Sequence, residues 1–332
     1  MQTLKITSWN VEKAHALVSG ATNAAELARR VRIRDILTAI GPDVLCLVEG
    51  PSGPEAVQRF AQEVLDNAWV PVLLDGPGDA RQYGIAGTQW IWFLVRPTLL
   101  DRCRLQHPSV WQAFTGQTSW PVHYWGDLAT DTHRHYRHPQ VLVLDLGGGA
   151  QIELIGLHLK SKINLNKLEL DADKNPTGAF LAEALDVRRY IDAKFDQKPA
   201  PGILLMGDGN DGPGRDFFES RYLFFDLVSN LQGDVVRAQR YFNHALFDFP
   251  ERLRWTARYD DPIGGVKAAN NPLLIDHIMM SQALCRGQLP LIAQAHAGTV
   301  EHEAFERGNA GATASQRSSD HRPVSLTLVA TT

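Results

Sequence analysis

Carboxylates, amides and imidazoles stand at the ends of several short apolar segments of this sequence. Asn10 ends the first segment, Glu49 ends the second, Asp208 and Asn210 close a later one, and Asp320 precedes the last. Glu49, Asp208, Asn210 and Asp320 offer oxygen ligands with no cysteine near them. Such a set suits a hard cation, Mg²⁺ or Mn²⁺, and does not suit zinc.

Histidines and a lysine accompany these oxygen ligands. His158 opens the sequence His-Leu-Lys-Ser-Lys, which also contains Lys160, and His321 directly follows Asp320. Imidazoles beside a bound cation transfer protons or stabilise an oxyanion. Cation, imidazoles and lysine together favour attack on a phosphoester. Each signal is weak alone, because a single Asp-Gly-Asn is more often a turn and a single Asp-His is commonly a surface pair.

The elements that must position these residues are short strands and a few helices. Apolar segments rich in Val, Ile and Leu predict strands at 4–9, 44–48, 90–95, 141–146, 152–157, 203–206, 274–280 and 324–329. Apolar side chains at helical spacing predict helices at 24–40, 55–67 and 179–195. The glycines at 147–149 predict a hairpin turn. Because ligands gather beyond the strand ends of such sheets, we expect the candidate residues to converge there.

Length and composition favour one globular domain. The 332 residues would allow two domains at about 150 residues each, but strands and helices mix from end to end without a linker, so a single domain over 1–332 is predicted. Hydrophobic residues at 44% and charged residues at 21% exclude a disordered chain. A net charge of -4 excludes binding of nucleic acid by bulk positive charge, although a local cleft can still be basic.

Cysteine use and hydropathy predict a reduced, cytoplasmic protein without a membrane partner. Cys46, Cys103 and Cys285 form neither a disulfide framework nor a zinc knuckle. Cys46 lies in an apolar segment and is expected to be a buried thiol. Neither a signal peptide nor an apolar stretch long enough for a membrane span is visible.

Two segments are predicted to be long loops. Residues 107–138 carry several aromatic side chains and five histidines without a clear period. We expect an insertion loop that buries its own aromatic rings, with a stacking wall for substrate bases as the alternative. Residues 304–319 are small and polar, which predicts a mobile loop before the last strand.

The motifs, taken in order, resemble the endonuclease/exonuclease/phosphatase superfamily. Their order is Trp-Asn, Pro-Asp-Val-Leu-Cys-Leu-Val-Glu, His-Leu-Lys-Ser-Lys, Gly-Asp-Gly-Asn, Ile-Asp-His-Ile and Ser-Asp-His-Arg-Pro, and the likeness runs from Leu4 to about Leu328. The resemblance implies an α/β fold, a four-layered sandwich in which two mixed β-sheets pack face to face with helices outside. It also implies a metal-dependent hydrolase in which water attacks a metal-polarised phosphate.

The resemblance implies a role for each matching residue. The implied metal-site residues are Asn10, Glu49 and Asp320, with Glu49 as the main ligand. The implied catalytic residues are His158, Asp208, Asn210, Asp276 and His321. The implied phosphate-binding residues are Arg137 and Lys160. Asp276 looks like the carboxylate that orients His321, which would fix its tautomer and favour its charged form.

Two positions depart from the family pattern. Gly209 stands where the family usually has an aromatic residue, which is expected to leave that loop roomier. In the deoxyribonuclease branch, a glutamate seven residues before the strand-ending arginine pairs with the first histidine, and counting back from Arg96 reaches Gln89. Gln89 is therefore the expected partner of His158. Since an amide is neutral, His158 should be less basic than in that branch.

The predicted substrate is nucleic acid, with DNA ahead of RNA. The sequence His-Leu-Lys-Ser-Lys resembles the bacterial nuclease branches, and Arg188 and Arg189 add basic character to a helix, although a solvated helix face explains that pair as well. The alternative enzyme is a phosphatase or phosphodiesterase that acts on a small or lipid phosphoester. A non-catalytic binding module would need missing ligands, whereas all the principal positions are filled.

Overall fold

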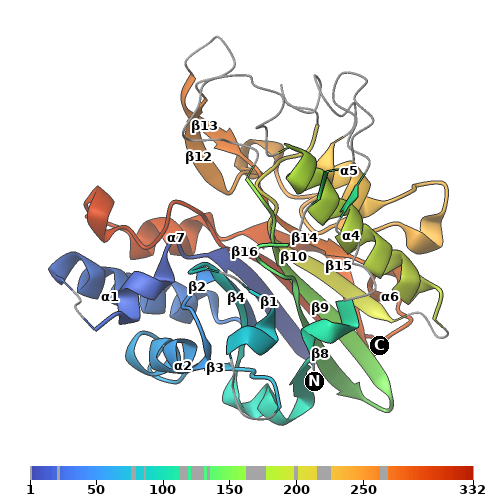
Figure 1. Cartoon of the computed structure of the whole chain (residues 1–332), viewed down its shortest axis with the longest axis horizontal. Coiled ribbons are helices and arrows are strands. Elements are labelled where there is room, and N and C mark those ends of the chain that lie inside the picture. The colour runs from blue at the N-terminus through green and yellow to red at the C-terminus, as the bar shows by residue number, and fades with distance from the viewer. Residues whose placement is uncertain are drawn as a thin grey trace.

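The apolar segments form strands that join two six-stranded mixed sheets in the described part of the chain (Figure 1). The computed structural model describes residues 2–20, 23–75, 80–85, 87–111, 119–120, 131–132, 135–161, 177–197, 201–214, 226–261 and 268–331. The first sheet has the order β15-β16-β1-β2-β4-β3 and consists of β1 (Thr3–Asn10), β2 (Val44–Gly50), β3 (Val70–Pro71), β4 (Trp90–Val95), β15 (Leu291–Val300) and β16 (Val324–Ala330). The second has the order β11-β14-β10-β9-β8-β5 and consists of β5 (Cys103–Leu105), β8 (Gln140–Gly147), β9 (Ala150–His158), β10 (Gly202–Asp208), β11 (Asn243–His244) and β14 (Asp276–Met280). Two separate ribbons are formed by β6 (Ser119–Trp120) with β7 (Asp131–Thr132) and by β12 (Ala257–Asp261) with β13 (Ala268–Leu273).

Helices cover the outer faces of both sheets. They are α1 (Ala24–Ile40), α2 (Pro54–Glu63), α4 (Thr177–Phe195), α5 (Leu227–Gln232), α6 (Gln282–Cys285) and α7 (His302–Gly308). Figure 1 shows α1, α2 and α7 on the side of the first sheet, and α4 and α5 on the side of the second. The sequence of α1 sets its ends, because Asn23 and Glu26 form a capping box and Gly41 closes the helix with φ 65°. The predicted four-layered α/β sandwich is thus confirmed.

Side chains of β9 alternate between two cores. Ile152 and Leu154 belong to the large core between the sheets, whereas Ile155 and Leu157 belong to the core under α4 and α5. Successive side chains of a strand point to opposite faces, so a strand buried on both sides reads as a continuous apolar run. This explains why the sequence shows short apolar segments without polar alternation.

The two sheets approach each other closely at Gly156 of β9. A Cβ at this position would lie 3.0 Å from Cys46 Sγ, 3.0 Å from Ile91 Cγ2 and 3.2 Å from Phe93 Cζ, all from the first sheet. Glycine is therefore required by packing rather than by backbone conformation. As predicted, Cys46 is a buried free thiol, and burial raises its pKa to about 12.

Several elements differ from the sequence-based expectations. The expected loop at 304–319 contains most of α7 and a short 3-10 helix at Ala314–Gln316. β15 and the ribbon of β12 and β13 were not predicted. Much of 107–138 lies outside the described residues, so its nature as an insertion stays a prediction. Trp111, which is described, is 1% exposed and stacks on Tyr190 of α4 at 3.9 Å, so its ring is not free to bind a base.

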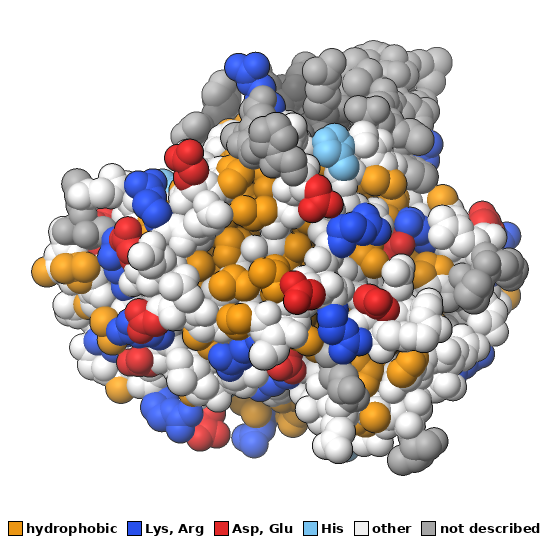
Figure 2. Space-filling model, turned by 90° about the horizontal axis from the view of Figure 1, so that it is seen from below, with side chains coloured by type: hydrophobic (Ala, Val, Ile, Leu, Met, Phe, Trp, Pro, Cys, Tyr) orange, Lys and Arg blue, Asp and Glu red, His pale blue; other side chains and the backbone are white. Residues whose placement is uncertain are grey.

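The described surface mixes both signs of charge. Figure 2 shows acidic and basic side chains around a central area of hydrophobic side chains, in keeping with the small net charge of -4. Among the described helices, none is long and apolar enough to cross a bilayer.

Candidate active site

Acidic and imidazole side chains form a row across the second sheet. In the strand register, Asp208 of β10 lies beside His158 of β9 on one side and beside Asp276 of β14 on the other. Each shares a strand face with residues of the core between the sheets, because alternate side chains of a strand point the same way. The row therefore lies at the end of that core. Its members are almost fully buried, with exposed fractions of 4% for His158, 2% for Asp208 and 0% for Asp276.

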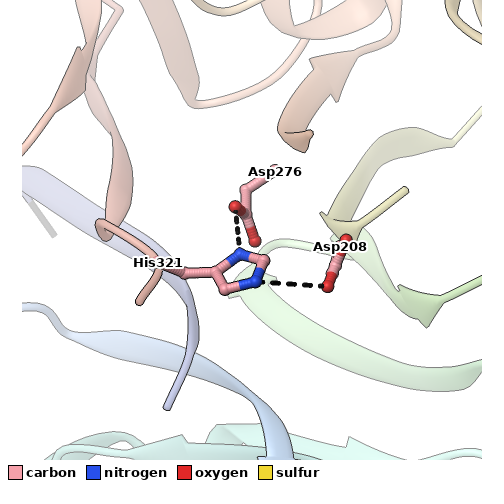
Figure 3. Close-up of side chains that lie close together, drawn as sticks. All are labelled: Asp208, Asp276 and His321. Carbon is pink, nitrogen blue, oxygen red and sulfur yellow. Dashed lines mark hydrogen bonds and ion pairs between the residues drawn. The ribbon is translucent and has the colours of Figure 1, made fainter. Parts of the chain in front are cut away.

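His321 joins this row from the segment that precedes β16. Its Nδ1 donates to Asp276 Oδ2 at 2.7 Å, and its Nε2 lies 3.9 Å from Asp208 Oδ2 (Figure 3). Its backbone is fixed as well, because Trp9 Nε1 donates to the His321 carbonyl at 2.9 Å and the His321 N–H donates to Ser319 Oγ at 3.0 Å. The predicted contact between Asp276 and His321 is present.

Opposing effects set the charge of His321. Burial lowers the pKa of this imidazole, but the carboxylates of Asp276, Asp208 and Asp320 outweigh burial and raise the pKa to about 10. At neutral pH the ring is therefore an imidazolium with two N–H donors. Because Nδ1–H donates its hydrogen bond to Asp276, Nε2–H is the donor that can bind an anionic oxygen.

Asp208 is the central acceptor of the site. Its Oδ2 accepts from Asn10 Nδ2 at 2.9 Å and lies 3.6 Å from His158 Nε2, while its Oδ1 accepts from the Asn210 N–H at 2.8 Å. Burial raises the pKa of Asp208 to about 6, against the lowering effect of His321. A carboxyl with this pKa can accept a proton from water near neutral pH.

The first sheet contributes Asn10 and Glu49. These residues end the parallel strands β1 and β2, so both reach the same edge. Asn10 Nδ2 donates to Glu49 Oε1 at 3.3 Å, and Asn10 Oδ1 accepts from the Glu12 N–H at 2.9 Å. Glu49 has φ 56° at an irregularity in the β2–β4 pairing, and its Oε2 accepts from the Lys13 N–H at 2.9 Å. Such a backbone costs on the order of 1–3 kcal/mol and is typical of functional sites.

The loop after β10 is packed tightly. Asn210 has φ 52°, and its Nδ2 donates to the Leu159 carbonyl at 2.9 Å. The expectation that Gly209 leaves this loop roomier is wrong. A Cβ at Gly209 would lie 3.0 Å from both His277 Cδ2 and Leu227 Cδ2, so these two side chains occupy the space near it.

The predicted pair of His158 and Gln89 does not form. Gln89 Oε1 accepts from Arg137 Nη1 at 2.5 Å, and His158 Nδ1 has no hydrogen-bond partner among the described residues. The prediction is wrong because Arg137 takes the amide oxygen, while its Nε and Nη2 donate to the carbonyls of His158 at 3.1 Å and Leu159 at 2.9 Å. The pKa of His158 does lie well below its ordinary value, but burial is the main cause, followed by the charges of Arg137 and His321.

The other predicted basic residues have different environments. Lys160 is exposed at the end of β9, where its backbone N–H donates to Glu183 Oε2 at 2.7 Å. Arg188 is 8% exposed, and its guanidinium donates to backbone carbonyls at the end of α5 and at residue 240. Arg188 therefore ties α4 to its neighbours and is not part of a solvated basic face. Arg189 pairs with Asp186 on the same helix at 3.6 Å.

Tyr259 belongs to the site although sequence reasoning did not find it. Its hydroxyl accepts from His321 Nε2 at 2.9 Å and donates to Asp320 Oδ2 at 3.2 Å. Burial, followed by the charge of Asp320, raises the pKa of Tyr259, so the phenol is neutral. The segment around it is rich in charged residues and lacks apolar alternation, and its role becomes visible only when β12 is placed.

A buried pair of histidines lies behind the row. His244 Nδ1 accepts from the Leu246 N–H at 3.1 Å, so its other nitrogen carries the proton and donates to His277 Nδ1 at 3.0 Å. His277 Nε2 then donates to the Asp211 carbonyl at 2.7 Å. Burial lowers the pKa of both rings, so both are neutral donors. The pair holds the loop that follows Asp208 against β14 and β11.

Oxygen atoms converge where a hard cation would fit. Glu49 Oε1 and Asp208 Oδ2 approach the same Asn10 nitrogen, at 3.3 Å and 2.9 Å. Burial raises the pKa of Asp208 to about 6, so a bound cation would favour the charged form of this carboxylate. Carboxylate and amide oxygens are the ligands that Mg²⁺ prefers. The residues present therefore fit such a cation on the Asn10 side of the row.

A second cluster is better suited to proton transfer than to metal binding. Ligand atoms of Asp208, Asp276 and His321 lie within 4.8 Å of one another. The Asp276 contact is, however, a hydrogen bond from an imidazole with a raised pKa, and a metal would have to replace that proton.

Comparison with known proteins places the fold. No protein-family profile matches this sequence, and neither does any curated protein. A solved structure of truncated Caenorhabditis elegans TDP2 matches with a TM-score of 0.53 at 14% identity, over 99% of this chain and 98% of that chain. D. rerio TDP2 complexed with single strand DNA product matches with a TM-score of 0.51 at 16% identity, over 98% of each chain. An endonuclease/exonuclease/phosphatase family protein from Bacteroides thetaiotaomicron matches with a TM-score of 0.50 at 14% identity, over 99% and 98%.

These likenesses span nearly the whole of each chain, and at such identities they concern the fold. The two face-to-face sheets and their outer helices agree with them. The chain therefore has the fold of the endonuclease/exonuclease/phosphatase superfamily.

Proposed function

We propose that this protein is a divalent-cation-dependent phosphodiesterase that hydrolyses nucleic acid, with DNA favoured over RNA. The observation that carries the proposal is the buried row of Asp276, His321 and Asp208, which meets Asn10 and Glu49 at the end of the two sheets. Such a row combines a fixed cationic donor with a basic carboxylate, which are the two groups that phosphoester hydrolysis requires.

His321 is suited to binding the reacting phosphate. Asp276 holds its Nδ1 at 2.7 Å, so the ring has one orientation and its Nε2–H has one direction. A charged donor fixed before the reaction stabilises negative charge that develops on phosphate oxygens without reorganisation. Arg137 and Lys160 are proposed to meet phosphate oxygens beside it.

Asp208 is suited to activating water. A water molecule that attacks phosphorus must lose a proton, and the pKa of Asp208, raised by burial to about 6, makes its carboxylate a base near neutral pH. The new P–O bond forms as the ester P–O bond breaks, and the leaving oxygen takes up a proton from solvent. Asn210, on the same loop, would orient the water through its side-chain amide.

Glu49, Asn10 and Asp320 are proposed to hold Mg²⁺ or Mn²⁺. When bound, the cation supplies Lewis-acid stabilisation of phosphate oxygens. It would also offset the charges of the carboxylates that meet at the site.

Nucleic acid is favoured over other phosphoesters by two observations. Lys160 is exposed at the end of the strand that carries His158, where a second backbone phosphate could bind. One solved structure with this fold, D. rerio TDP2, holds a single strand DNA product. The choice of DNA over RNA rests on the resemblance of His-Leu-Lys-Ser-Lys to bacterial nuclease branches.

A panel of labelled DNA, RNA and small phosphoesters, assayed with Mg²⁺, Mn²⁺ or EDTA, tests the proposal. Acid-soluble nucleotides are expected with either cation and none with EDTA. Release of inorganic phosphate from small esters, without cleavage of nucleic acid, would favour a phosphatase instead. No turnover of any substrate with any cation would contradict the proposal.

Glu49→Gln tests the metal assignment. The substitution keeps the size of the side chain but removes its charge, so we expect kcat/KM to fall by about 100-fold or more. Calorimetric titration with Mn²⁺ should show weaker binding. Exposed Glu55 provides the matched control, since Glu55→Gln should change neither quantity. Full activity of the Glu49 variant would rule out the assignment.

A further inference from the structure

The ribbon of β12 and β13 is anchored to the segment that carries His321. Ala257 forms a β-bridge with His321, and the Arg322 N–H donates to the Thr256 carbonyl at 2.7 Å. Thr256 Oγ1 in turn accepts from the Asp276 N–H at 3.1 Å. The base of the ribbon thus contacts both partners of the Asp276–His321 pair.

A stack of cationic and aromatic side chains reinforces this base. The guanidinium of Arg322 lies 3.8 Å from the centre of the Trp255 ring, and that of Arg258 lies 4.0 Å from it. The contact with the indole fixes the Arg258 guanidinium on the Trp255 side of the ribbon. Since Tyr259 points to the opposite face of β12, its ring is directed towards His321.

The hydroxyl of Tyr259 occupies the free side of the His321 ring. It lies 2.9 Å from His321 Nε2, whose other nitrogen is held by Asp276. The phenolic proton goes to Asp320 Oδ2 at 3.2 Å. Asp276, His321, Tyr259 and Asp320 therefore form one continuous hydrogen-bonded chain in which each donor is defined.

We propose that Tyr259 is a further catalytic residue, which holds the place of a phosphoryl oxygen in the free protein and donates a hydrogen bond to that oxygen in the complex. The inference rests on the proposed function, because it assumes that His321 Nε2 meets the phosphate. An oxygen that accepts from Nε2–H in the free protein marks where an anionic oxygen would bind. The phenol then has a proton to give, because its donor bond to Asp320, at 3.2 Å, is longer than the roughly 2.5–3.0 Å that is usual for hydroxyl donors.

Tyr259 is required only to donate a hydrogen bond in this step. Its hydroxyl has two fixed partners, His321 Nε2 at 2.9 Å and Asp320 Oδ2 at 3.2 Å, and neither bond requires the phenol to ionise. No proton leaves Tyr259, and the leaving oxygen takes its proton from solvent.

The Tyr259→Phe variant shows whether the hydroxyl donates a hydrogen bond to bound phosphate or only blocks His321 Nε2. A phenylalanine ring of the same shape keeps the packing but removes the hydroxyl. If the hydroxyl donates to a bound phosphoryl oxygen, the variant should bind inorganic phosphate about 10-fold more weakly in the presence of Mg²⁺, measured by calorimetric titration. If it only covers Nε2, its removal should free that donor and phosphate should bind more tightly.

Kinetics on bis(p-nitrophenyl) phosphate provide the second measurement. We expect kcat/KM of Tyr259→Phe to fall by about 10- to 100-fold, because a donor to a charged oxygen is lost. The control is Tyr241→Phe, because Tyr241 precedes β11, which pairs with β14 at its Met280 end, away from Asp276. The control variant should match the wild type in both measurements, and thermal unfolding should show that both variants fold.

The possible outcomes distinguish a failure of the role of Tyr259 from a failure of the proposed function. Weaker phosphate binding together with lower kcat/KM supports the role of Tyr259. Unchanged or tighter phosphate binding by Tyr259→Phe overturns it, as does a wild-type protein that binds no phosphate. A wild type that hydrolyses no phosphodiester contradicts the proposed function, and the phosphate titration then still decides whether Tyr259 is a donor.

Discussion

At the scale of single residues, His321 owes its orientation to groups that are distant in sequence. Asp276 holds one nitrogen, Tyr259 meets the other, and Trp9 fixes the backbone carbonyl. These residues lie on three separate strands, so no local pattern around His321 encodes its environment. The charge of the ring comes from the distant carboxylates of Asp276 and Asp208 as well as from Asp320, its neighbour in the chain.

Asp276 and His321 are expected to act as one unit. His321→Ala should lower kcat/KM by about 100-fold or more, since a positioned donor or acid is lost. Asp276→Ala should lower kcat/KM to a similar extent, because His321 loses the carboxylate that orients its ring and that helps to keep it protonated. The double variant should be hardly worse than His321→Ala alone, because groups that function together show non-additive losses.

The comparison needs a residue that contributes only to folding. Asp226 caps α5 through the Ser229 N–H and serves this purpose. Combining Asp226→Ala with His321→Ala should multiply their separate effects. Multiplicative losses for Asp276 and His321 as well, in the same kinetic cycle, would show that the pair does not work as a unit.

At the scale of elements, the separation of the sheets positions the row of His158, Asp208 and Asp276. Gly156 lets β9 approach the first sheet, and His158 ends the same strand. On the other sheet β1 and β2 run parallel, which brings Asn10 and Glu49 to that end. The position of the site therefore depends on how closely β9 packs against β2 and β4.

Gly156→Ala should destabilise the protein and impair the site together. The added Cβ would lie 3.0 Å from Cys46 Sγ and from Ile91 Cγ2, and such overpacking costs about 1–3 kcal/mol. Urea unfolding should show the loss, and kcat should fall because His158 shifts with its strand. Gln151→Ala, at an exposed position of β9, is the control and should change stability by less than about 0.5 kcal/mol. Equal stability of the two variants would mean that the sheets adjust freely.

At the scale of the whole molecule, buried neutral histidines make stability depend on pH. The pKa values of His138, His158, His244 and His277 are all lowered, with burial as the main cause. His138 is the clearest case for a test, because its pKa is lowered to about 4 and it lies outside the proposed catalytic row. Its Nδ1 donates to the Pro139 carbonyl at 2.7 Å.

The protein should lose stability between pH 7.5 and pH 5.5, and His138 should account for a defined part. Because its folded pKa lies below the unfolded value of about 6.5, its contribution is complete above about pH 6.5 and is lost as the pH falls towards 4. For one such histidine the loss at pH 5.5 is about 1.4 kcal/mol. His138→Asn, whose amide can keep the bond to Pro139, should therefore reduce the pH-dependent loss by about that amount.

Urea unfolding at the two pH values measures this difference. The control is His296→Asn, because His296 has an exposed side chain and should leave the pH dependence nearly unchanged. A His138 variant with the same pH dependence as the wild type would show that His138 is already protonated at pH 5.5 in the folded protein.

The sequence by itself determined which segments become the main strands and which residues end them. Residues 44–48 and 203–206 read as strands because burial on both faces requires a short run of apolar side chains, and this requirement is visible locally. Polar residues that close such runs, such as Glu49 and Asp208, could be expected to meet because strand ends share an edge. Short elements escaped prediction, since β12 has little apolar alternation and α7 spans only His302–Gly308.

Only the tertiary structure decided which side chains touch. Gln89 was expected beside His158, yet it accepts from Arg137, and Arg188 was read as a surface charge, yet it is buried between α4 and α5. Tyr259 reaches His321 because β12 bridges the segment before β16. Burial and backbone preference are properties of a segment and are determined by its own residues. Contacts between side chains depend on strand register and on the separation of two sheets, which no single segment contains.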